Sequence, residues 1–217
     1  MASPHLIHIR TEACETQGLI RSAGGNLRRL TNELYETPLD AFDLFMLFST
    51  STIERISLNS RTNFNAVVHN SAQVNDSRTG RITFDNTTSY GSDGRLLGVN
   101  VLDTMPRGIN SVNAAHEILH QWSSYTSTSL GLNDGTNRYK QNSSVASLLG
   151  GFEWIDNGNG TFTVNCAKGG GRGAHHASLL DQYMMGLIDG SGIQIFICTM
   201  KKSFRSKSAG SATPLSP

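Results

Sequence analysis

The chain contains the stretch His116-Glu117-Ile118-Leu119-His120, in which two histidines stand four residues apart. On a helix, residues four apart lie one above the other, so both imidazoles can reach a single metal ion. Two neutral imidazole nitrogens suit Zn²⁺, which keeps an open position for water when three protein ligands bind it. Glu117 can then accept a proton from that water and pass it to a leaving amine. The pattern is the H-E-x-x-H signature of zinc-dependent peptidases.

The residues around the motif predict a helix whether or not a metal binds. Asn110 and Ser111 offer an N-cap. Apolar side chains then recur at helical spacing, at Val112, Ala115, Leu119 and Trp122. The alternative to a metal-binding helix is an ordinary amphipathic helix with two histidines on its polar face.

Length and composition are those of a globular protein. A chain of 217 residues, 37% hydrophobic and 16% charged, can bury a core as one domain. A formal net charge of +1 indicates neither a nucleic-acid partner nor a basic membrane-binding surface. No apolar run is long enough to span a bilayer. We therefore expect a peptide or protein substrate, no nucleic acid and no membrane span, while the oligomeric state has no signal in the sequence.

The pattern along the chain predicts strands before the motif helix and loops after it. Residues 1–39 form an irregular N-terminal segment with one short helix at 31–36. Strands are expected at 41–48, 65–69, 81–85 and 95–103, and the nearly continuous apolar run of the first is typical of a central strand buried on both faces. The fold class is therefore α+β, with a twisted mixed β-sheet packed on the motif helix.

The second half of the chain is predicted to be loop-rich. A short helix at 143–149 ends at Gly150-Gly151, and residues 152–166 read as a hairpin around an Asp-Asn-Gly-Asn-Gly turn. A further helix is expected at 177–187. The domain then spans residues 40–190, and the basic, Ser-rich stretch 191–217 is predicted to be a disordered or artificial tail.

The third metal ligand is not given by spacing from the motif. Peptidases with short histidine spacing place Gly and His three and six residues beyond the second histidine, where this chain has Ser123 and Thr126. A glutamate about twenty residues further on is the other common solution, and position 140 is Lys140. The downstream candidates that remain are Asp134, Glu153, Asp156, His175, His176 and Asp181. Two of them are favoured as alternatives: Asp181, on the last predicted helix, and His176, five residues before it.

Several blocks together carry a resemblance to a known family. They are residues 41–48, Tyr90-Gly91-Ser92, the motif through Trp122, Leu148-Leu149-Gly150-Gly151, residues 154–162 and Asp181 to Leu187. These blocks resemble bacterial, usually exported, zincin-type metallopeptidase domains, over roughly residues 40 to 190. The resemblance implies a zincin-like fold, His116 and His120 as zinc ligands, and Glu117 as general base.

The resemblance also bears on the third ligand and on location. Tyr183-Met184-Met185-Gly186 is similar to the methionine turn of related peptidases such as leishmanolysin, where a distant histidine completes the site, and this favours His176 or His175. Relatives carry a histidine where this chain has Arg138-Tyr139, and an arginine cannot ligate zinc. An extracellular or cell-surface location is implied, although the first thirty residues hold charges in place of a signal peptide.

The sequence thus predicts a zinc-dependent endopeptidase that hydrolyses peptide bonds through a metal-activated water. The alternative is a catalytically inactive zincin-like binding or adhesion module that has lost a metal ligand. A purely structural metal site, closed by four protein ligands, is a further alternative.

Overall fold

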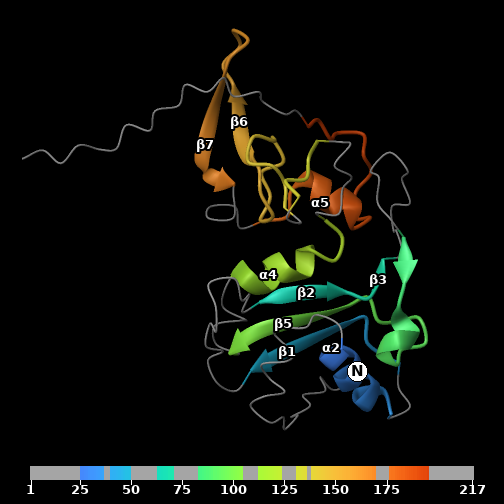
Figure 1. Cartoon of the computed structure of the whole chain (residues 1–217). Coiled ribbons are helices and arrows are strands. Elements are labelled where there is room, and N and C mark those ends of the chain that lie inside the picture. Colours follow the sequence, from blue (N-terminus) through green and yellow to red (C-terminus); the bar gives the residue numbers. More distant parts are fainter. Residues whose placement is uncertain are drawn as a thin grey trace, which may run out of the picture.

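The computed structural model describes residues 25–36, 40–49, 63–70, 83–104, 112–123, 131–135, 138–169 and 176–195. These residues form a mixed α+β structure (Figure 1). Its elements in order are α2 (Gly25–Tyr35), β1 (Leu44–Ser49), β2 (Phe64–Val67), β3 (His69–Asn70), β4 (Phe84–Asp85), the 3₁₀ helix η2 (Thr87–Tyr90), β5 (Gly98–Thr104), α4 (Val112–Leu119), β6 (Phe152–Asp156), β7 (Phe162–Gly169) and α5 (Leu179–Met184).

The main sheet is mixed, and β5 is its central strand. The strand order is β1-β5-β2, with β1 parallel and β2 antiparallel to β5. Among the described strands, β1 lies at an edge of this sheet and β5 at its centre, so the prediction of a central strand at 41–48 is wrong for this set of strands. The side chains explain the difference: Val99 and Leu102 of β5 are fully buried, whereas residues 44–48 of β1 are only half-buried.

The N-terminal helix is longer than the sequence predicted and belongs to the core. It begins at Gly25 in place of the expected residue 31. Leu27 is fully buried in a cluster with Val68 and Val99, and the Tyr35 ring lies 5.4 Å from that of Phe45 on β1. Residues 25–35 thus belong with the sheet, within a segment expected to be irregular.

A carboxylate ties the start of β1 to the loop before β5. Ser92 donates its hydroxyl to both carboxylate oxygens of Asp40 at 2.9 Å, and the Asp93 N–H donates to one of them at 2.7 Å. Partial burial raises the pKa of Asp40, but these hydrogen bonds outweigh burial and hold it below its usual value. The ionised carboxylate is therefore the form that the fold stabilises.

The lowered pKa of Asp40 predicts a pH dependence of stability. The unfolded carboxyl titrates near pH 4, so the contribution of Asp40 is complete above that pH and is lost as pH falls through the lower pKa of the folded state. Asp40→Asn should cost about 1 kcal/mol at neutral pH, and its deficit from wild type should shrink as pH falls below about 4.

Urea unfolding at several pH values measures this deficit. The matched control is Asp43→Asn, which removes a carboxylate whose partner Arg95 lies 3.3 Å away on the surface, with side chains more than half exposed. Such pairs contribute little. A deficit for Asp40→Asn that stays constant across the pH range would contradict the assignment.

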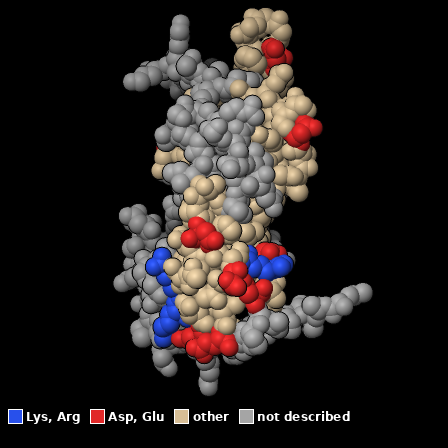
Figure 2. All heavy atoms as spheres, turned by 90° about the vertical axis from the view of Figure 1, so that its right-hand side faces the viewer, with Lys and Arg blue, Asp and Glu red and all other residues tan. Residues whose placement is uncertain are grey.

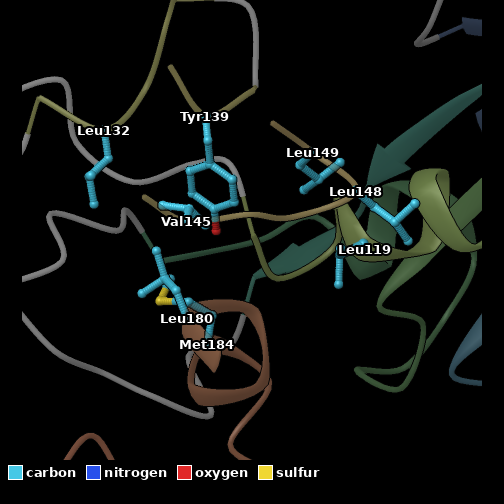
Figure 3. Packing of buried hydrophobic residues seen from close by; sticks show 8 residues of the cluster. All are labelled: Leu119, Leu132, Tyr139, Val145, Leu148, Leu149, Leu180 and Met184. Atoms are coloured by element: carbon cyan, nitrogen blue, oxygen red, sulfur yellow. The ribbon is translucent and has the colours of Figure 1, made fainter. Parts of the chain in front are cut away.

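The second half of the molecule has its own core, built from loops and α5. Its buried members are Leu119, Leu132, Tyr139, Val145, Leu148, Leu149, Leu180 and Met184 (Figure 3). Because Leu119 comes from α4, the motif helix touches this cluster while it also contacts β2 and β5. The helix therefore lies between the sheet and the loop-rich half (Figure 1).

Residues 143–149 are not the short helix that the sequence predicted. They form turns and isolated bridges, because serine side chains bond to the backbone in place of helical partners. The Ser143 hydroxyl donates to the Lys140 carbonyl at 2.7 Å, and the Ser147 hydroxyl accepts from the Leu149 N–H at 3.0 Å. Ala146 also has a left-handed φ of 51°, which a helix does not allow.

The predicted hairpin is confirmed. Strands β6 and β7 pair antiparallel, with Trp154 opposite Val164 and Asp156 opposite Phe162. Side chains within the turn bond to its own backbone: Asp156 Oδ1 accepts from the Gly158 N–H at 2.9 Å, and Asn159 Oδ1 accepts from the Thr161 N–H at 3.1 Å. Local hydrogen bonds of this kind are typical of Asx turns.

Charges of both signs are interspersed over the sheet-containing half of the face shown in Figure 2. Two of the pairs are Arg95 with Asp43 and, one helical turn apart, Arg29 with Glu33. Within the described residues, no helix is both long and apolar enough to cross a membrane.

Candidate metal centre

Helix α4 carries the first histidine, and its final turn carries the second. The helix runs from Val112 to Leu119, and the His120 N–H continues the turn by donating to the Glu117 carbonyl at 3.2 Å. The predicted N-cap at 110–111 lies outside the described residues. His116 is half-buried and His120 is only 8% exposed, so the pair faces the interior and not the polar surface of an ordinary amphipathic helix.

The two imidazoles converge on one point. His116 Nε2 and His120 Nε2 are 3.1 Å apart, and the rings meet edge to face with an interplanar angle of 81°. The i, i+4 spacing of the motif predicted this convergence, and the structure shows it.

A backbone carbonyl fixes the orientation of the first histidine. The Leu148 carbonyl oxygen lies 3.0 Å from His116 Nδ1. A carbonyl only accepts hydrogen bonds, so Nδ1 carries the proton in the neutral ring and Nε2 keeps its lone pair. In this arrangement His120 Nε2 donates to His116 Nε2 when no metal is bound. A ligating histidine is commonly oriented in the same way, by a hydrogen bond from its other nitrogen.

The geometry of the pair fits a zinc ion. Two nitrogens that bind Zn²⁺ at about 2.0–2.1 Å in tetrahedral geometry are about 3.3 Å apart, close to the 3.1 Å observed between the Nε2 atoms. The donor set also fits, because neutral imidazole is a preferred zinc ligand. Glu117 follows His116 by one residue, about 100° further round the helix, and is half-buried.

The structure does not add either predicted third ligand to the pair. Among the residues it describes, no three His, Cys, Asp or Glu side chains gather into a group able to hold a metal. His176 is described and its side chain is exposed, while His175 lies outside the described residues. The identity of the third ligand therefore stays a prediction.

Asp181 is engaged elsewhere. It is fully buried, and its Oδ2 accepts from the N–H and hydroxyl of Ser178 at 2.7 and 2.8 Å. Ser178 in turn accepts from the Asp181 N–H, which makes a capping box at the start of α5. The other carboxylate oxygen, Oδ1, accepts from the Tyr139 hydroxyl at 3.0 Å. The spacing Ser178-x-x-Asp181 was a sequence signal for this cap.

The backbone of His176 is linked to the histidine pair through Leu148. The Leu148 N–H donates to the His176 carbonyl at 3.3 Å, while the Leu148 carbonyl accepts from His116. One residue therefore joins the segment before α5 to the first histidine. The sequence analysis did not identify this role of Leu148, because every residue type supplies a backbone carbonyl.

The structure also describes Arg138-Tyr139, the position where the family that the sequence resembles carries a histidine. Arg138 is exposed, and the Tyr139 side chain is fully buried. Met184 is fully buried in the same cluster as Leu119 and Leu148, so it packs in the core of the loop-rich half (Figure 3).

A buried glutamine anchors the end of α4 to the sheet half. Gln121 is 1% exposed, and its Nε2 donates to the His69 carbonyl at 2.9 Å. A Cβ at Gly98 would lie 2.4 Å from the Gln121 side-chain oxygen, so the glycine of β5 leaves room for the side chain in this position. Gln121 thus fixes the end of α4 to the sheet half, and the Leu148 carbonyl fixes His116.

Comparisons with protein-family models, with curated proteins and with solved structures find no match to this chain.

Proposed function

We propose that this chain is a zinc-dependent endopeptidase of the zincin type, with His116 and His120 as metal ligands and Glu117 as general base. One observation carries the proposal: the two Nε2 atoms converge to 3.1 Å while the Leu148 carbonyl fixes the outer nitrogen of His116. The contact of α4 with a mixed sheet supports it.

In the proposed reaction the metal site, Glu117 and strand β2 have separate roles. A bound Zn²⁺ supplies Lewis acidity and makes water a stronger nucleophile at neutral pH. Glu117 accepts the proton from the attacking water and returns it to the departing amine. Among the described strands, β2 lies at an edge of the sheet and contacts α4, and an extended peptide can pair with such an edge.

Of the two predicted third ligands, His176 fits better than Asp181. Both carboxylate oxygens of Asp181 already accept hydrogen bonds, from Ser178 and Tyr139. His176 has its backbone next to Leu148 and an exposed side chain. An extracellular or cell-surface location remains a prediction from the resemblance.

Zinc stoichiometry tests the proposal. Elemental analysis of purified wild type should give one zinc per chain. His120→Ala should lose it, because a single histidine on a helix binds zinc far more weakly than two. His176→Ala should lose zinc, while Asp181→Asn should retain it. A well-folded wild type without zinc would refute the peptidase proposal.

A second candidate is an inactive binding module with the same fold. It is favoured by the lack, among the described residues, of a third side chain grouped with the pair. One zinc per chain combined with no cleavage of unfolded protein substrates would support this candidate over the enzyme.

A further inference from the structure

The turn that contains Leu148 is held by backbone hydrogen bonds and follows a residue with an unusual backbone conformation. Ser147 and Gly150 exchange backbone hydrogen bonds at 2.8 and 3.0 Å, which closes a tight turn around Leu148. Just before it, Ala146 has a φ of 51°, a conformation that non-glycine residues adopt only when their surroundings hold them there. A constrained segment therefore lies against the nitrogen that sets the tautomer of His116.

The backbone of Tyr139 is hydrogen-bonded to the same turn. Its N–H donates to the Leu149 carbonyl at 3.0 Å, and its backbone bridges to Gly150. The approach is close, because a Cβ at Gly150 would lie 2.4 Å from the Tyr139 carbonyl oxygen. A shift of the Tyr139 backbone must therefore move the peptide next to Leu148.

The side chain of Tyr139 is fixed at its far end. Figure 3 shows the ring lying within the core cluster with its hydroxyl directed toward α5. That hydroxyl donates to Asp181 Oδ1 at 3.0 Å, and both residues are fully buried. A buried hydrogen bond to a carboxylate is among the stronger ones, since losing the donor leaves a buried acceptor unsatisfied.

We propose that the buried Tyr139–Asp181 pair positions the turn at 147–150, so that the Leu148 carbonyl holds His116 with its proton on Nδ1 and its Nε2 toward His120. Tyr139 and Asp181 are then positioning residues, which act on the metal site through the backbone. The expected effect on metal affinity rests on the proposed function. The tautomer of His116 does not, because it is a property of the metal-free protein.

The test reads the tautomer directly. Two-bond ¹H–¹⁵N correlations of the metal-free, ¹⁵N-labelled full chain at about pH 8, above the ordinary histidine pKa, should show His116 protonated on Nδ1. In Tyr139→Phe the His116 signals should shift toward a mixture with the Nε2-protonated form. The zinc dissociation constant should rise by roughly 10–100-fold, as is typical when an outer-shell partner is lost.

Two further variants separate positioning from general stability. Ser92→Ala removes a hydroxyl–carboxylate hydrogen bond of 2.9 Å in the sheet half and should leave the His116 tautomer unchanged. Asp181→Asn keeps an Oδ1 acceptor for Tyr139 but removes the Oδ2 acceptor of the α5 cap, so it should cost stability while the tautomer is retained.

Three results would overturn the proposal: a wild-type His116 that is not protonated on Nδ1, an unchanged tautomer in folded Tyr139→Phe, or an equal change in Asp181→Asn. The first is read without any variant, so it applies even if Tyr139→Phe does not fold. Wild type that binds no zinc would refute the proposed function and leave the tautomer test intact.

Discussion

Replacing Glu117 by glutamine is expected to leave one zinc bound per chain and to lower peptide hydrolysis by about a hundred- to ten-thousand-fold. The amide has nearly the shape of the carboxylate but cannot accept a proton from the attacking water. Glu117 lies beside His116 on α4, and its backbone carbonyl accepts from the His120 N–H, so an isosteric change should leave the helix and the histidine pair in place.

The measurement pairs zinc content with the rate of cleavage of an unfolded protein substrate. Glu33→Gln is the matched control, because Glu33 is 55% exposed and pairs only at 3.7 Å with Arg29 one turn away, an interaction of small effect. It should retain both zinc and activity. If Glu117→Gln kept wild-type activity, Glu117 could not be the general base.

Replacing Gly150 by alanine is expected to be strongly destabilising, at roughly 3–5 kcal/mol. Two costs combine. The φ of 135° is one that L residues rarely adopt, and the new Cβ would lie 2.4 Å from the Tyr139 carbonyl oxygen. The obstacle is backbone and not the end of a flexible side chain, so relief requires moving the turn around Leu148.

Gly158→Ala is the control for Gly150→Ala. Gly158 also has a positive φ, 75°, but a Cβ there meets nothing within 4 Å. It should therefore cost only about 1 kcal/mol, the conformational term alone. Chemical denaturation of the two variants measures the difference, and equal losses would show that the approach of Gly150 to Tyr139 is not tight in solution.

The parts of the fold that the sequence predicted well are those set by local periodicity. Two short strand-like runs on either side of a glycine-rich turn predicted the hairpin, and the i, i+4 histidines predicted a convergent pair. The helix predicted at 143–149 from its Gly150-Gly151 end is wrong, because the hydroxyls of Ser143 and Ser147 bond to nearby backbone groups.

The remaining features depend on contacts between distant segments. A parallel pair such as β1 and β5 has no local signal for which strand lies in the middle, so the apolar run at 41–48 was assigned to the centre. The contacts of Asp181 also depend on distant segments; its place on the last predicted helix made it a candidate ligand, and no local pattern indicates its hydrogen bond to Tyr139. Its partner Tyr139 is 42 residues away in sequence.

The central place of β5 has a consequence for how the chain folds. Its neighbours β1 and β2 both precede it, so neither has this partner until β5 is available. Parallel pairing across a long intervening segment carries a large loop-closure entropy and forms slowly, whereas the hairpin β6–β7 closes locally. Helix α4 docks against β5, so the histidine pair is assembled on the part of the chain expected to form last in refolding.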